Sequence, residues 1–399
     1  MANRRLSLIL PLLAVIVGAG LLLLGPRLKR GGPAATPPAL VTHQRTVPRV
    51  MSTVATLTVV AEPRQAAEAT QTLDEIEAVL RGVEARMSVR LADSELSRLN
   101  AAPVGQATPL SPPMREVLER ARDFAGQSRG AFDVTCRPIL EMWRLAGQRQ
   151  AAPSPREISQ AVESTGWRWF ELTEAGGPQT PVRAFGGPGL VRKREGASID
   201  LGGIGKKYAI DRAAEVVLRR RLPGGMINVG GDIRCVGRKD APGPWRIGVR
   251  NPFSNDPGDL MAVIAIEQGS VCTSGNYERF VELGGRRYSH IVDPRTGMPC
   301  DNAPSVTVVG PDATTAGLWA TALSVLGVEG LKLMPRQGTP PPAGLEVMMV
   351  VGRTASESRW YRTAGLDRLL VEPGPPQPPT ELPAEAATTS APATPLRGG

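Results

Sequence analysis

The order of hydrophobic and polar positions predicts strands and helices between residues 49 and 370. The β-branched run Val54–Val60 is typical of a strand. Between residues 65 and 86, apolar residues recur at steps of three and four, which gives a helix one apolar face. These residues are Leu73, Ile76, Leu80, Val83 and Met87. Further helices are expected over 112–125, where Ser111 is a suitable N-cap, and over 209–220 and 312–327.

The predicted strands do not alternate regularly with the helices. They are expected at 225–230, 245–250, 261–267 and 305–309. A doubly wound parallel sheet would require regular alternation, so the order favours a single large domain of the α+β class. Residues 175–197 are rich in Gly and Pro and are expected to form a surface excursion.

The two ends of the chain have a different character from its middle. Arg4-Arg5 precede an apolar run from Leu6 to Gly25, and a helix of that length spans about 30 Å, enough to cross a bilayer. The next residues form a poor cleavage site, so residues 1–30 are predicted to be an uncleaved, single-pass signal anchor. A cleaved signal peptide and a buried core helix are the alternatives. Residues 31–48 are interpreted as a linker, and residues 371–399 as a disordered Pro-rich tail.

The composition limits the classes of partner and site. The net charge of +9 is compatible with an anionic partner, but the basic residues are scattered and no nucleic-acid-binding motif is present, so nucleic acid is not expected. With two His and four Cys, a zinc site made of protein ligands is not expected either. The cysteines form no C-x-x-C pair, and their spacing leaves open whether they form disulfides or remain buried thiols.

A Gly-rich turn is the clearest chemical motif in the middle of the chain. In Ser198–Asp211 a short apolar strand leads into Gly202-Gly203, and a helix begins near Lys206. Free N–H groups at a helix N-terminus attract phosphate, and Lys206 adds a full positive charge. The turn is neither a Walker A loop nor a Rossmann Gly-x-Gly-x-x-Gly. It predicts a phosphate contact, with a plain tight connection as the alternative.

Several segments, in the same order along the chain, resemble the motifs of the ApbE family, the FAD:protein FMN transferases. They are Met51–Thr53, Met87–Asn100, Gly130–Thr135, Asp200–Lys206, Asn228–Asp232, Thr273–Tyr277 and Ser289–Gly297. A last segment, Ala316–Thr321, resembles the family's Ala-Asp-Ala-Leu-Ala-Thr, but Gly317 stands at the position of the Asp. Lys207 replaces a Gly of the family pattern.

The resemblance implies one ApbE-like (T-fold-like) domain over residues 49–370 with a cleft for FAD. The residues that it implies as FAD contacts are Met51, Arg90, Gly130, Ala131, Phe132, Asp200, Lys206 and Ile291. It also implies that Asn228 and Asp232 hold the geometry of their loop. Arg90 stands where the family often has a Tyr, and a guanidinium can stack on an aromatic plane or pair with phosphate.

The activity that the resemblance implies is transfer of FMN from FAD to a Thr or Ser hydroxyl of an acceptor protein, with release of AMP. The implied Mg²⁺ ligands are the main-chain carbonyl of Gly203, a carboxylate at position 317 and the hydroxyl of Thr321. Gly317 supplies no ligand, and Asp312 is the nearest carboxylate upstream that could substitute. The charge of Lys207 is a second candidate for replacing part of the metal's field.

His290 is the candidate catalytic base that takes the hydroxyl proton. The alternative is that His290 is a buried hydrogen-bonding residue that positions Asp293. Two other functions stay open beside the transferase: an FAD-binding pseudoenzyme, and an FAD pyrophosphatase that releases FMN and AMP. The resemblance favours a globular domain on the extracytoplasmic side of the cytoplasmic membrane.

Overall fold

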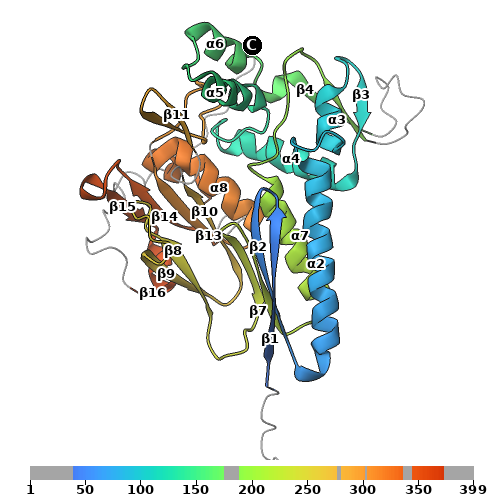
Figure 1. Cartoon of the computed structure of the whole chain (residues 1–399), viewed down its shortest axis with the longest axis vertical. Helices are drawn as coiled ribbons and strands as arrows, with labels where there is room; N and C mark the ends of the chain where they lie inside the picture. The colour runs from blue at the N-terminus through green and yellow to red at the C-terminus, as the bar shows by residue number, and fades with distance from the viewer. Residues whose placement is uncertain (1–38, 175–187, 276–279, 302, 336–343, 373–399) are drawn as a thin grey trace, which may run out of the picture. The chain divides into compact units, whose positions relative to one another are not determined.

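An eight-stranded antiparallel sheet is the centre of the fold in a computed structural model, which describes residues 39–174, 188–275, 280–301, 303–335 and 344–372. Its strands, in spatial order, are β1 (Val41–Val50), β2 (Thr53–Ala61), β6 (Gly224–Val229), β7 (Asp232–Gly237), β10 (Gly269–Gly275), β13 (Ser305–Gly310), β14 (Glu346–Val351) and β15 (Arg359–Arg362) (Figure 1). The predicted signal anchor, residues 31–38 of the predicted linker and residues 373–399 of the predicted tail lie outside the described residues.

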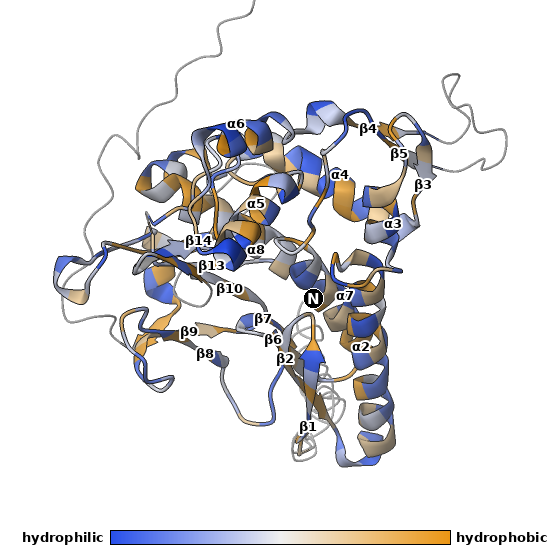
Figure 2. Ribbon diagram, turned by 45° about the horizontal axis from the view of Figure 1, so that its top comes forward, coloured by the Kyte–Doolittle hydropathy of each residue, from blue (hydrophilic) through white to orange (hydrophobic). Residues whose placement is uncertain are grey.

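Three helices pack on one face of this sheet: α2 (Ala66–Met87), α7 (Gly205–Arg219) and α8 (Ala313–Leu326). The predicted apolar stripe of α2 is buried from Leu73 to Met87, and Figure 2 shows hydrophobic and hydrophilic positions alternating along this helix. Trp319 of α8 is 1% exposed. The stretch Ala313–Leu333 is long and apolar enough to be a candidate membrane span, but most of it is buried in this core.

A smaller sheet covers the other face of the large sheet. It contains β16 (Leu370–Glu372), β9 (Leu260–Ile266) and β8 (Trp245–Arg250). Alternate residues of the large sheet serve the two cores, so that Val59 packs toward the helices and Val60 toward the small sheet. Strands covered on both faces are buried at nearly every position and are rich in apolar residues, as β13 and β14 show.

The remaining helices gather beyond one end of the large sheet (Figure 1). They are α3 (Glu95–Ala101), α4 (Pro112–Gln127), α5 (Arg137–Arg149) and α6 (Pro155–Glu163). With them lie a three-stranded sheet of β3 (Ala107–Pro109), β5 (Gly189–Arg192) and β4 (Phe170–Thr173), and the hairpin of β11 (Phe280–Leu283) and β12 (Arg286–Ser289). Short 3₁₀ turns occur at Pro63–Gln65, Trp167–Trp169, Gly327–Leu333, Ala355–Glu357 and Ala364–Arg368.

The predicted strands and helices are confirmed, with three differences at their boundaries. Residues 41–48 were expected in the linker but belong to β1, which forms an edge of the large sheet and alternates exposed with half-buried residues. Residues 189–192 of the expected surface excursion form the central strand β5 of the small three-stranded sheet. Helix α7 begins at Gly205, within the Gly-rich segment and before residue 209.

Candidate functional site

The Gly-rich turn is held from two sides before α7 begins. Asp200 accepts a hydrogen bond from the Gly202 N–H at 2.7 Å, and its own N–H donates to the Val134 carbonyl at 2.8 Å. The side chain of Asn100, on α3, exchanges two hydrogen bonds of 2.8 Å with the N–H and carbonyl of Ile199. These contacts fix the backbone that leads into the N-terminus of α7.

The segment Gly130–Phe132 lies against this turn, as the resemblance implies. A Cβ atom built on Gly203 would lie 2.8 Å from the Phe132 ring, so only glycine permits this approach. A Cβ atom on Gly130, whose φ is +76°, would lie 3.5 Å from the side chain of Arg295. The Gly-rich turn, residues 130–132 and the loop 289–297 therefore meet.

Two lysines in the first turn of α7 surround one buried carboxylate. The Nζ atoms of Lys206 and Lys207 lie 2.9 Å and 3.6 Å from Oδ2 of Asp232, which is 2% exposed. Burial opposes ionisation of Asp232, but the charges of Lys207 and Lys206 outweigh it and hold its pKa below the usual range. Cations at a helix N-terminus oppose the helix dipole, so two of them here favour a bound anion.

Asp232 follows a glycine turn that also contacts the start of β2. Asn228 accepts a hydrogen bond from the Gly231 N–H at 3.0 Å, which confirms its predicted role in holding the loop. The Gly230 N–H donates to the Val54 carbonyl at 3.0 Å. Asp232 does more than shape this loop, because it also binds the lysines of α7.

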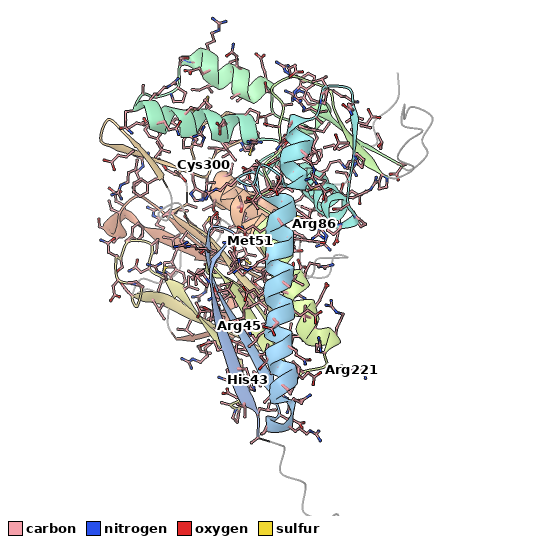
Figure 3. All side chains as sticks on the ribbon, turned by 45° about the vertical axis from the view of Figure 1, so that its right-hand side comes forward. His43, Arg45, Met51, Arg86, Arg221 and Cys300 are labelled. Carbon is pink, nitrogen blue, oxygen red and sulfur yellow. The ribbon has the colours of Figure 1, made fainter. Side chains whose placement is uncertain are left out.

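Met51 lies in the turn between β1 and β2, beside the C-terminal part of α2 (Figure 3). Its N–H donates to Glu84 Oε1 at 2.8 Å, and its half-buried side chain packs against the main core. Arg90 is exposed and donates to the Ser52 hydroxyl at 2.9 Å. Ser52 and Arg90 line a hollow of about 610 Å³, whose lining does not include Asp200 or Lys206.

The predicted residues of the loop 289–297 differ from one another in their exposure to solvent. Ile291 is 7% exposed and belongs to the core, with its N–H bonded to the Ser289 hydroxyl at 3.0 Å. His290 is exposed, so the alternative of a buried His290 is wrong. Asp293 is bound by Arg295 of its own turn at 2.7 Å. Exposure leaves His290 accessible to a hydroxyl group of another protein.

The implied Mg²⁺ ligand set does not fit the residues of α8. Thr321 donates its hydroxyl to the Gly317 carbonyl at 3.0 Å, and Gly317 brings no carboxylate. Asp312 cannot replace it, because both of its carboxylate oxygens bond to Thr315 as the N-cap of the helix. Across the part of the chain that the structure describes, no cluster of three or more His, Cys, Asp or Glu residues could hold a metal ion.

All four cysteines are free thiols. Burial raises the pKa of Cys235 and of Cys300 to about 12, and raises the pKa of Cys136 and Cys272 as well. Thiols with such pKa values are protonated at neutral pH and are weak nucleophiles. The structure therefore shows free thiols and no disulfide among these four cysteines, with Cys136 half-buried and the other three buried.

Two residues that support the site were not predicted as functional. Asn100 is the last residue of the segment Met87–Asn100, and its place in this motif was the only sequence signal for a role. Asp211 accepts hydrogen bonds from the N–H groups of Ala313 and Thr314, at 2.8 and 2.9 Å, and joins α7 to the N-terminus of α8. Asp211 closes the Gly-rich motif Ser198–Asp211, which is the sequence signal that could have found it.

The fold and this site define a mixed α/β domain in which a glycine turn and two lysines lie together at the N-terminus of α7. The family model of the ApbE family matches residues 51–342, and the chain belongs to this family.

Two curated relatives of this chain have the same name. The FAD:protein FMN transferase of Salmonella typhimurium is 28% identical over 350 residues, covering 87% of this chain and 94% of the relative. The FAD:protein FMN transferase of Treponema pallidum is 32% identical over 278 residues, covering 67% and 74% of the two chains.

Solved structures support the same fold. The ApbE protein from Thermotoga maritima matches with a TM-score of 0.69 and 27% identity, covering 83% of this chain and 100% of that one. The flavin transferase ApbE from Vibrio cholerae matches with a TM-score of 0.68 and 26% identity, with the same coverage. The predicted class, a single mixed domain of the ApbE type, is thereby confirmed.

Proposed function

We propose that this protein is an FAD:protein FMN transferase that moves FMN from FAD to a Thr or Ser hydroxyl of an acceptor protein. The observation that carries the proposal is the meeting of the glycine turn at Gly203, the Phe132 segment and the lysines of α7 at one helix N-terminus. Relatives that align over most of this chain bear the name of this activity.

The reaction replaces the phosphoanhydride bond between the FMN and AMP halves of FAD by a phosphoester bond between FMN and the acceptor. The acceptor oxygen bonds to the phosphorus of the FMN half, and the bond from that phosphorus to the bridging oxygen of the pyrophosphate breaks. AMP leaves with the bonding electron pair, and the hydroxyl proton passes to a base, for which exposed His290 is the candidate. Lys206, Lys207 and the N–H groups that begin α7 neutralise charge on the pyrophosphate and the transferring phosphoryl group.

The proposed mechanism does not include a step that involves Mg²⁺. The resemblance implies a Mg²⁺ ion, but Gly317 supplies no carboxylate and Asp312 is engaged as an N-cap. The positive charge that the transfer needs is assigned to the residues that are present.

The N-terminal segment is proposed to anchor the enzyme in the cytoplasmic membrane, with its globular domain on the extracytoplasmic side. Support comes from the twenty apolar residues Leu6–Gly25, which are long enough to span a bilayer as a helix. Cell fractionation and protease accessibility of the full chain in spheroplasts test this arrangement. Recovery of the intact protein in the soluble fraction would contradict it.

The activity is tested with the full chain, FAD and an acceptor domain that carries a Thr flavinylation site from a system with an ApbE-family transferase. The expected result is flavin fluorescence on the denatured acceptor, together with release of AMP. Release of FMN and AMP without an acceptor would instead indicate a pyrophosphatase, and FAD binding without AMP release would indicate a pseudoenzyme. Replacing the acceptor Thr by Val is the control, and it should abolish labelling.

A further inference from the structure

Two departures from the family pattern occur at positions that touch. The family motifs place a Gly at position 207 and an Asp at position 317, whereas this chain has Lys207 and Gly317. A Cβ atom built on Gly317 would lie 2.5 Å from Cγ, 2.6 Å from Cε and 3.0 Å from Cδ of Lys207. The lysine stem therefore occupies the space into which any side chain at position 317 would extend.

Gly317 is explained by this contact and not by the needs of its helix. Glycine is the least favourable residue in a helix interior after proline, yet Gly317 lies within α8 and is buried. Its missing side chain makes room for the stem of Lys207, which is only 12% exposed. The two positions form a matched pair: relative to the family pattern, the side chain is smaller at position 317 and larger at position 207.

The exchange also conserves the local charge. A carboxylate of charge −1 that holds a divalent ion of charge +2 contributes about +1 to the site, and a single ammonium contributes the same. Lys206 lies 2.9 Å from Asp232 and is the closer counter-ion, whereas Lys207 lies 3.6 Å away. One of the two positive charges at the start of α7 therefore remains for a ligand.

We propose that the ammonium of Lys207, whose carbon stem packs on Gly317, replaces the metal ion as the fixed positive charge on the FAD pyrophosphate. The chain then binds and uses FAD without a divalent cation. This inference rests on the proposed function and adds to it the residue that performs the metal's electrostatic role. An ammonium acts on phosphate as a point charge with three hydrogen-bond donors.

Binding of FAD and of riboflavin to the full-length protein, measured with Mg²⁺ and with EDTA, tests the proposal. Wild type should bind FAD equally in both conditions. Lys207→Met keeps the stem and removes the charge, so FAD affinity should fall roughly 10- to 100-fold, as expected for loss of a charge-assisted contact. Riboflavin has no phosphate, so its affinity should not change. Lys193→Met is the matched control, because Lys193 pairs with Glu171 outside the site.

The double variant Lys207→Gly, Gly317→Asp restores the family pair and provides the converse test. Its FAD affinity should become dependent on Mg²⁺ and fall in EDTA. Gly317→Asp alone should bind FAD poorly in both conditions, because the new carboxylate meets the lysine stem.

Three outcomes would overturn the proposal alone: FAD binding by wild type that is lost in EDTA, Lys207→Met that binds FAD normally, or a Lys207→Met loss that is equal for riboflavin. Failure of wild type to bind FAD in either condition would overturn the proposed function, and this inference with it.

Discussion

Backbone strain is concentrated in the turn that presents Met51. Arg49, Met51 and Ser52 have φ values of 52°, 51° and 62°, in the left-handed region that residues with a Cβ atom rarely adopt. The hydroxyl of Ser52 also accepts the hydrogen bond from Arg90, so the strained turn holds a side-chain contact with the segment that follows α2.

Ser52→Gly should therefore stabilise the protein. Relief of the positive φ is expected to raise the free energy of unfolding by about 1 kcal/mol, reduced slightly by loss of an exposed hydrogen bond. Ser94→Gly is the matched control: its φ is −66°, and its hydroxyl caps α3, so it should lower stability. Urea unfolding measures the free energy of unfolding of both variants. An unchanged or lower stability of Ser52→Gly would refute the role of strain.

Asp232 should make stability dependent on pH. Because its pKa is lowered in the folded protein, its contribution is complete above the usual Asp pKa of about 4 and disappears as the pH falls through its lower folded value. Asp232→Asn leaves Lys206 and Lys207 without their carboxylate, so at pH 7 it should cost about 3 kcal/mol, the lower end for a broken buried pair.

Urea unfolding at a series of pH values measures this effect. The difference in the free energy of unfolding between wild type and Asp232→Asn should stay constant from pH 7 to about 5. It should become smaller below about pH 4. A gap that widens toward acid would contradict the assigned direction of the pKa shift.

At the scale of elements, α3 acts as a clamp on the Gly-rich turn. Asn100 closes a pair of hydrogen bonds with the main chain of Ile199, and Glu95 accepts hydrogen bonds from the N–H and hydroxyl of Ser111 at the start of α4. A short helix thereby connects the site to the helices beyond the end of the sheet.

Asn100→Ala should destabilise the protein and weaken FAD binding together. Two buried backbone groups of Ile199 lose their partners, which should cost about 2 kcal/mol or more. Asn100→Asp should be at least as damaging, because a carboxylate accepts from the Ile199 N–H but repels its carbonyl. Urea unfolding and FAD titration measure the two effects. Normal FAD affinity in a destabilised Asn100→Ala would limit the clamp to a structural role.

The sequence predicts those elements whose residues pack with a regular period. Helix α2 has an apolar stripe of period 3.6, and β13 is rich in valine and buried throughout because both of its faces are covered. Strand β1 was placed in the linker because it is an edge strand whose partner on the other side is solvent, so its pattern is largely polar. Pairing with β2, and not composition, makes it a strand.

The sequence motifs single out the residues of the candidate site one by one, but not the contacts between them. The motifs identified Phe132, Asp200 and Lys206, since each lies in a short recognisable segment. Lys207 of α7 packs on Gly317 of α8. A local sequence pattern does not predict a contact between residues so far apart in the chain. The burial of Ile291 and the exposure of His290 likewise depend on how their loop packs, not on its letters.

At the scale of the whole domain, the large sheet connects the site to both cores. Its helix-covered face carries α7 and α8, which bear the lysines and Gly317, and its other face is sealed by β8, β9 and β16. The β1–β2 hairpin closes one edge of this sheet and delivers Met51 to the end where the turn at Gly230 lies. Stability of the site should therefore depend on the outermost strand.

Truncation tests this dependence. A chain that begins at Leu40 keeps β1 and should unfold at the temperature of the full-length protein. A chain that begins at Met51 loses the buried side chains of Val47 and Val50, a loss of roughly 3–6 kcal/mol of hydrophobic stabilisation, and exposes the edge of β2. The shorter chain should melt at lower temperature and aggregate, as thermal unfolding and light scattering would show. Equal behaviour of the two chains would mean that residues 41–50 are dispensable, as a linker would be.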